Sequence, residues 1–136
     1  MRLLVATIIA SACLTGSAHA QQQCLHGADS TPDQKARRSS ALSVMRAINT
    51  AESAFASRNQ RQYGTLKELL DSGALKPMLR DTPLNFESDQ PLLGWKLEFS
   101  SNKDGYAFLL KDTTDPCSFA FFSTQDGLIF HGEPIR

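Results

Sequence analysis

The residues best suited to chemistry in this chain are two cysteines and two histidines. Cys24 and His26 lie near one end of the sequence, and Cys117 and His131 lie near the other. Two thiolates and two imidazoles can bind zinc in a tetrahedral site. The Cys-x-His spacing and the wide separation of the two halves match no usual ligand spacing, and oxidation competes for the thiols. We therefore predict no metal and no cofactor.

A disulfide is the use of the cysteines that the sequence favours. The chain has three cysteines, and Cys13 lies in an N-terminal segment that we expect to be removed. Cys24 and Cys117 then remain, and in an oxidising compartment such a pair joins. The bond would close a loop over most of the chain, which the chain-entropy model values at about 4 to 5 kcal/mol of stability.

Enzymatic chemistry has weak support in the sequence. Cys24 or Cys117 could act as a nucleophile with His26 or His131, but a sulfur in a disulfide is not a nucleophile. The sequence contains neither Gly-x-Ser-x-Gly nor His-Glu-x-x-His, the common local motifs of serine hydrolases and zinc proteases. We predict no catalytic residues and a protein that is not an enzyme.

Two pairs of carboxylates could act as acid–base pairs. They are Asp112 with Asp115, and Glu87 with Asp89, and paired carboxylates are what glycoside hydrolysis uses. Each pair lies in a loop rich in polar residues, where acids exposed to solvent are expected. The sequence therefore favours a solvated role for both pairs.

A basic cluster and an aromatic set could bind partners. Lys35, Arg37, Arg38 and Arg46 could meet an anionic partner such as lipid headgroups or polysaccharide, or form the solvated side of a helix. The whole chain has 14 basic and 14 acidic residues, which argues against nucleic-acid binding. Aromatic residues at strand spacing, Trp95 among them, are expected in the core rather than on a binding platform.

The first twenty residues resemble a secretory signal peptide. Arg2 supplies positive charge, residues 3–14 are almost wholly apolar, and Ala18-His19-Ala20 offers small residues for cleavage before Gln21. The apolar run is shorter than the roughly 20 residues that span a membrane. A lipobox ending at Cys13 stays open as an alternative. We expect a periplasmic or secreted protein.

The mature chain should form an N-terminal arm, residues 21–30, and one domain, residues 31–136. Thr31, Pro32 and Gln34 form a capping box with proline at the first helical position, which predicts a helix to about residue 58 or 59. Its apolar stripe is expected to face the core, and Asn49 is expected to face outward. The stripe consists of Ala41, Val44, Ile48, Ala51 and Phe55.

A second capping box at residues 65–68 predicts a short helix that ends near Gly73. Beyond an irregular, proline-containing segment, the apolar period changes from 3.6 to 2. Four strands are expected, at about residues 95–100, 106–110, 117–122 and 128–131. Short turns between them predict an antiparallel meander and an α+β fold, with the long helix packed on the sheet. The third strand is apolar on both faces and should need cover on both.

Several short segments resemble the globular domains of type IV pilin-like and type II secretion pseudopilin proteins. The resemblance covers about residues 36–132. It implies a pilin-like globular domain, but the pilin leader, its processing site and the long apolar N-terminal helix are missing. The segments are residues 46–52 (RAINTAE), 63–69 (YGTLKEL), 73–75 (GAL), 105–108 (GYAF), 118–122 (SFAFF) and 126–129 (DGLI).

Together these features lead us to expect an exported, non-enzymatic binding or assembly module with a protein partner in the cell envelope. An alternative is a periplasmic inhibitor or stress-type binding protein on the same scaffold. A small Cys- or metal-dependent hydrolase is a third hypothesis, and it requires a free reactive thiol or a bound metal.

Overall fold

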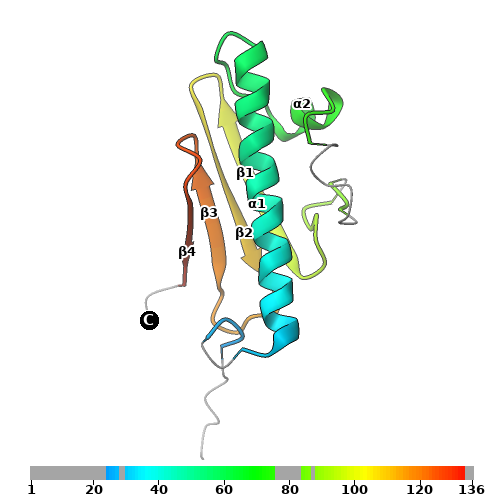
Figure 1. Cartoon of the computed structure of the whole chain (residues 1–136), viewed down its shortest axis with the longest axis vertical. Coiled ribbons are helices and arrows are strands. Elements are labelled where there is room, and N and C mark those ends of the chain that lie inside the picture. The colour runs from blue at the N-terminus through cyan, green and yellow to red at the C-terminus, as the bar shows by residue number, and fades with distance from the viewer. Residues whose placement is uncertain (1–23, 28–29, 76–83, 87, 134–136) are drawn as a thin grey trace, which may run out of the picture.

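The protein is a long helix lying along one face of a four-stranded antiparallel sheet (Figure 1). This computed structural model describes residues 24–27, 30–75, 84–86 and 88–133, so the expected signal peptide lies outside the described residues. Strand order in the sheet is β1-β2-β3-β4, which confirms the predicted meander and the α+β class. The elements are α1 (Pro32–Arg58), α2 (Leu66–Asp71), β1 (Trp95–Asn102), β2 (Gly105–Asp112), β3 (Ala120–Thr124) and β4 (Ile129–Gly132).

Both helices begin where the capping boxes predict. The Thr31 side chain accepts a hydrogen bond from the Gln34 backbone N–H, and the Gln34 side chain accepts one from the Thr31 N–H at 2.7 Å. Thr65 and Glu68 make the reciprocal pair at the start of α2. Each box satisfies backbone donors that a helix start leaves free, and such a cap typically contributes about 1 kcal/mol.

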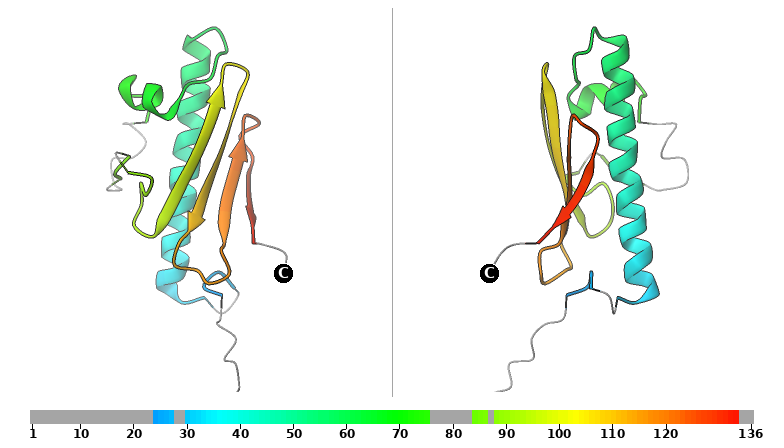
Figure 2. Two further views of the ribbon diagram at one scale, coloured as in Figure 1. Left: turned by 180° about the vertical axis from the view of Figure 1, so that it is seen from behind. Right: turned by 60° about the vertical axis from the view of Figure 1, so that its left-hand side comes forward.

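The core lies between α1 and the inner face of the sheet, as Figure 2 (right) shows in side view. Trp95 is fully buried and stacks on Phe121 with ring centroids 5.8 Å apart. Tyr106 is 5% exposed and stacks on Phe108. These aromatics are therefore core residues, as expected. From α1 the core takes Ala41, Val44, Met45, Ala47, Ile48 and Ala51.

Asn49 faces the sheet, so the expectation that it faces solvent is wrong. Its Nδ2 donates to Ser123 Oγ at 2.9 Å and to the Gly127 carbonyl at 3.0 Å, while the Tyr106 hydroxyl donates to its Oδ1 at 3.0 Å. Asn49 lies next to the buried Ile48 on α1, and the turn between β3 and β4 lies close enough to bond to its side chain. The contact fastens the β3–β4 hairpin to α1.

The third strand begins later than predicted. Cys117 to Phe119 lie outside β3, which runs from Ala120 to Thr124. The Cys117 N–H donates to Asp115 Oδ1 at 2.8 Å, and Ser118 has a φ of 56°, in the left-handed region. A left-handed residue cannot continue a strand. The chain therefore completes a turn before the strand starts.

Glu52 is a carboxyl group buried completely within this core. Its Oε2 accepts a hydrogen bond from the Gly64 N–H at 3.1 Å, while its Oε1 has no hydrogen-bond partner among the described residues. Burial raises the pKa of Glu52; the Gly64 hydrogen bond opposes this effect, and the charge of Glu68 adds to it. Burial, with a smaller contribution from Glu52, raises the pKa of Tyr106 to about 12.

Glu52 should make the native state less stable as pH rises. Because its pKa is higher in the folded than in the unfolded chain, the folded protein favours the neutral acid, and this advantage is lost as pH climbs from the ordinary value of 4.5 through the raised pKa. We expect Glu52→Gln to flatten this decline and to raise the free energy of unfolding at pH 8. Urea denaturation at several pH values measures it.

Glu98→Gln is the matched control, because Glu98 is an exposed glutamate of β1. Its pH profile should follow that of the wild-type protein. A Glu52→Gln profile as steep as the wild-type profile would show that burial of Glu52 does not govern the effect.

Candidate functional site

Cys24 and Cys117 form a disulfide, as predicted. Their Cα atoms are 5.4 Å apart, a normal separation for the bond, and 93 residues separate them in sequence. Groups that could bind a metal include Cys24 with His26 and Asp115, and both cysteines with Glu133. Because the two sulfurs are joined to each other, neither is available as a thiolate ligand or nucleophile in this oxidised state.

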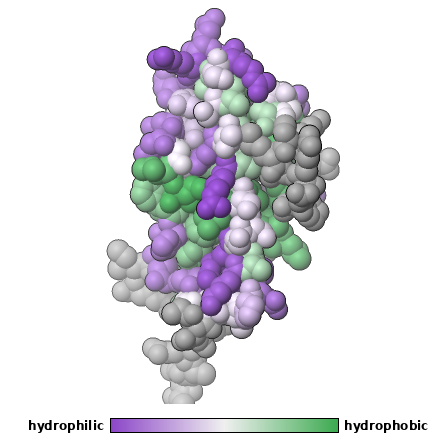
Figure 3. All heavy atoms as spheres, viewed as in Figure 1, coloured by the Kyte–Doolittle hydropathy of each residue, from purple (hydrophilic) through white to green (hydrophobic). Residues whose placement is uncertain are grey.

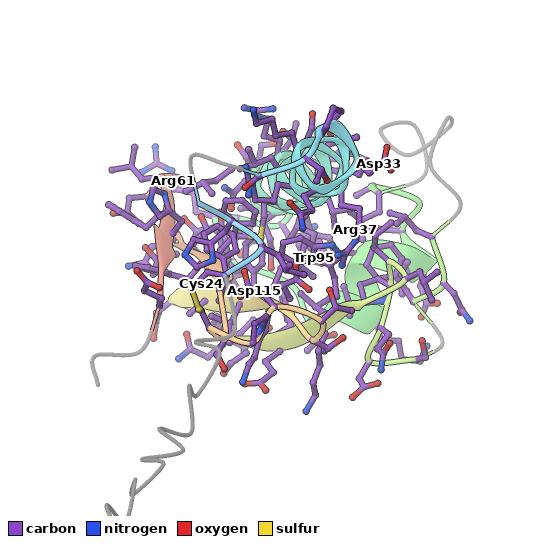
Figure 4. The ribbon with its side chains drawn as sticks, turned by 90° about the horizontal axis from the view of Figure 1, so that it is seen from below. Cys24, Asp33, Arg37, Arg61, Trp95 and Asp115 are labelled. Carbon is purple, nitrogen blue, oxygen red and sulfur yellow. A yellow bond between two sulfur atoms is a disulfide. The ribbon has the colours of Figure 1, made fainter. Side chains whose placement is uncertain are left out.

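His26 connects the N-terminal arm to two acids beside the disulfide. Its Nδ1 lies 2.6 Å from Asp115 Oδ2, and its Nε2 lies 3.2 Å from Glu133 Oε2. The imidazole stacks on Phe119, with centroids 4.6 Å apart. Cys24 and Asp115 lie close together at the end of the molecule where α1 starts (Figure 4). The arm is therefore held by the contacts of His26 as well as by the disulfide of Cys24.

Asp112 and Asp115 are buried, so the prediction that they are solvated is wrong. Burial alone would raise the pKa of Asp115, but hydrogen bonds from His26 and from the Cys117 N–H, with the charge of His26, lower it below its ordinary value. Its contribution to stability is therefore lost as pH falls through that lowered pKa. In the other predicted pair, Asp89 is exposed, and Glu87 lies outside the described residues.

Two members of the predicted basic cluster have structural partners. Arg37 donates to Thr114 at 2.8 Å and to Asp112 at 3.2 Å, and its guanidinium lies 5.9 Å from the ring centroid of Trp95. Arg38 donates to the backbone carbonyl of Leu25 at 3.0 Å. These contacts hold the arm and the end of β2 against α1.

Lys35 and Arg46 are exposed. The described residues thus leave two of the four cations of this cluster free of the structural contacts that occupy Arg37 and Arg38. An anionic partner for the cluster stays a prediction, and these two side chains are the ones that such a partner could reach.

The sheet face opposite α1 carries an apolar row that crosses three strands. Leu109 pairs with Phe122, and Phe122 pairs with Phe130 in the registers of β2, β3 and β4. Phe122 and Phe130 are 40% and 44% exposed, and their rings stack with centroids 5.1 Å apart. Shallow depressions of about 310 Å³ and 300 Å³ adjoin this row. We call Leu109, Phe122 and Phe130 the outer apolar row.

No described element covers the outer apolar row. Figure 2 (left) shows the sheet from this side, with α1 behind it. The expectation that the third strand is apolar on both faces holds for β3, since Phe121 is buried against α1 and Phe122 points to the opposite face. The described part of the chain does not cover the face that carries Phe122.

β4 forms the edge of the sheet beside this row (Figure 1). Its backbone pairs with β3 on one side, and on the other side it has no backbone partner among the described residues. Leu128, just before the strand, is 58% exposed, and hydrophobic residues gather on the side of the molecule where β3 and β4 lie (Figure 3). At the opposite edge, the Leu97 N–H of β1 donates to the Asp89 carbonyl at 2.7 Å.

The exposure of Leu128 and Phe130 was not expected from the sequence. Both lie in the apolar run of residues 128–131, which was expected to form the fourth strand of a sheet packed on the helix. Alternation alone identifies which residues share a face, but not that the strand is at the edge of the sheet. The apolar character of the third strand on both faces was the one signal that pointed to this surface.

The Asn49 contact should control the mobility of the hairpin that carries Phe122 and Phe130. We expect Asn49→Ala to increase hydrogen exchange of the backbone amides in residues 123–132, because it removes the bonds to Ser123 and Gly127. Ser53→Ala, at an exposed position of α1, should leave exchange unchanged. Equal exchange in both variants would show that the core alone positions the hairpin.

Loss of the disulfide should lower stability strongly. For a loop of this length the chain-entropy model gives about 4 to 5 kcal/mol, so Cys24→Ala/Cys117→Ala should unfold at a much lower denaturant concentration. Reductant should lower the midpoint of the wild-type protein and leave the double variant unchanged. A wild-type midpoint that does not respond to full reduction would contradict this role.

No helix in the described part of the chain is long and apolar enough to cross a membrane. No protein-family model, no curated protein and no solved structure matches this chain. The arrangement of the helix on the sheet is therefore known from the structure alone. Kinship with pilins or pseudopilins remains a prediction.

Proposed function

We propose that this protein is an exported, non-enzymatic binding or assembly module, and that it binds a protein partner in the cell envelope through the outer apolar row. The observation that carries the proposal is the stacked pair of Phe122 and Phe130, each at least two-fifths exposed on a sheet face that no described element covers. Aromatic side chains of this kind anchor many protein interfaces.

Two features support an exported protein. The disulfide between Cys24 and Cys117 is a bond that persists in oxidising compartments, and residues 1–20 have the zones of a signal peptide. Periplasmic or secreted location follows from both as part of the proposal. The long helix on an antiparallel meander is also compatible with the pilin-like resemblance.

Two paired sets of polar side chains near the start of α1 favour a structural role over catalysis. His26 joins the arm to Asp115, and Arg37 joins α1 to Asp112. Each of these groups already has a hydrogen-bond partner from a distant part of the chain. The apolar surface, in contrast, has no partner within the described residues, and burying apolar area is worth about 25 cal/mol per Å².

The proposal predicts a partner whose capture depends on the outer apolar row. We expect the immobilised wild-type protein to enrich a defined protein from a cell-envelope extract, and Phe122→Thr/Phe130→Thr to retain at least tenfold less of it. Quantitative mass spectrometry of the eluates measures the ratio. Threonine keeps strand propensity while removing the aromatic surface.

Leu93→Thr is the matched control, because Leu93 is 90% exposed and lies outside β1 to β4. It should capture the partner as the wild-type protein does, and circular dichroism should show all three proteins folded. Equal capture by all three, or no specific capture by the wild-type protein, would defeat the proposal. Stoichiometric capture of a single enzyme, with loss of its activity, would favour the inhibitor hypothesis.

A further inference from the structure

We propose that the chain with reduced cysteines binds one zinc ion at the end of the molecule where α1 begins. The ligands are the thiolates of Cys24 and Cys117, an imidazole nitrogen of His26 and a carboxylate oxygen of Glu133. Zinc binding and the disulfide are then alternative uses of the same two sulfurs. The inference goes beyond the proposed function, because no residue of the outer apolar row is a ligand.

The potential ligand atoms already lie close together in the folded chain. Atoms of Cys24, Cys117 and Glu133 lie within 4.8 Å of one another, and so do atoms of a second group, Cys24 with His26 and Asp115. His26 Nε2 lies 3.2 Å from Glu133 Oε2. Two ligands of one tetrahedral zinc ion are separated by about 3.3 to 3.8 Å, given the usual lengths of bonds from zinc to nitrogen, oxygen and sulfur. Once the two sulfurs are separate, side-chain rotations can therefore bring four ligands around one ion.

Asp115, which lies beside Cys24 in Figure 4, holds two of these ligands in place. Its buried carboxylate accepts a hydrogen bond from the Cys117 N–H through Oδ1 at 2.8 Å, and its Oδ2 lies 2.6 Å from His26 Nδ1. When Nδ1 donates its proton to Asp115, Nε2 presents its lone pair on the side of Glu133. Zinc-bound histidines typically donate their other ring N–H to a carboxylate in the same way. The chain thus supplies the ligands and also the hydrogen bonds that orient them.

The donor set favours zinc among the common divalent cations. Thiolates are soft ligands that Mg²⁺ and Ca²⁺ do not select, and thiolate with imidazole is typical of tetrahedral zinc. Four protein ligands fill the coordination sphere and leave no position for a catalytic water, as in structural zinc sites. The ion would fasten the arm to the residues that follow β2 and β4, which the disulfide and His26 do in the oxidised chain. The site therefore agrees with a protein that is not an enzyme.

A disulfide oxidant converts the zinc-bound state into the oxidised state. Two zinc-bound thiolates, two protons and one molecule of oxidised glutathione give the Cys24–Cys117 disulfide, two molecules of reduced glutathione and free Zn²⁺. The two protein sulfurs lose two electrons in this exchange, and the two glutathione sulfurs gain them. We expect one Zn²⁺ to be released for each disulfide that forms.

Zinc titration of the reduced protein tests the proposal. With a phosphine reductant present, the wild-type protein should bind one Zn²⁺, and Co²⁺ in its place should show the visible bands of tetrahedral coordination with thiolate-to-metal charge transfer. The oxidised protein, which has no thiolate, should show neither. His26→Gln and Glu133→Gln should each weaken zinc binding at least about tenfold. The matched controls His131→Gln and Glu98→Gln replace exposed residues outside both groups, so they should bind zinc as the wild-type protein does.

Circular dichroism keeps the test decisive for a reduced chain that unfolds, because zinc binding then appears as refolding. Zinc should refold the reduced wild-type protein, and His26→Gln should need at least about tenfold more zinc for the same recovery. A reduced protein that neither binds zinc stoichiometrically nor refolds with it would overturn the inference. Equal binding by the oxidised protein, or by both His26→Gln and Glu133→Gln, would overturn it as well.

Discussion

A sheet has two faces, and the described part of this chain has one long helix with which to cover them. The apolar stripe of α1 packs against the inner face, where Trp95, Leu110 and Phe121 are almost completely buried. This packing provides the main hydrophobic core of the domain. It also leaves the other face, with Phe122 and Phe130, exposed. The stability of the fold and its candidate binding surface thus arise from the same packing arrangement.

Polar contacts decide how α1 is seated on the sheet. Asn49 bonds to the β3–β4 hairpin, and Arg37 bonds to Asp112 at the end of β2. Buried polar groups stabilise one arrangement only where they find partners, because an unsatisfied group in the interior costs about 1 to 3 kcal/mol. These contacts therefore select the position of the helix, while apolar burial provides most of the driving force.

Two buried polar atoms have no such compensation among the described residues. They are Glu52 Oε1 and Trp95 Nε1. A carboxyl group in this position favours its neutral form, and the fold tolerates it because Gly64 satisfies the other oxygen. At the end of the molecule where α1 begins, the disulfide and the contacts of His26 fasten the arm.

Local sequence determined the features that depend on neighbours in the chain. The two capping boxes located the helix starts because capping acts over three residues, and alternation located the strands because side chains of a strand alternate between faces. The pairing of Cys24 with Cys117 followed from compartment and count. Because side chains of a strand alternate between the two faces of the sheet, the sequence also indicated that β3 is apolar on both faces.

Only the tertiary structure decided which polar residues are buried and which apolar residues of the strands stay exposed. The inward orientation of Asn49, the burial of Asp112 and Asp115, and the position of β4 at the open edge depend on contacts between residues far apart in the chain. The late start of β3 depends on a turn in which a left-handed Ser118 follows Asp115. Periodicity carries no information about which strand has a neighbour, so the candidate binding surface emerged only when helix and sheet were packed together.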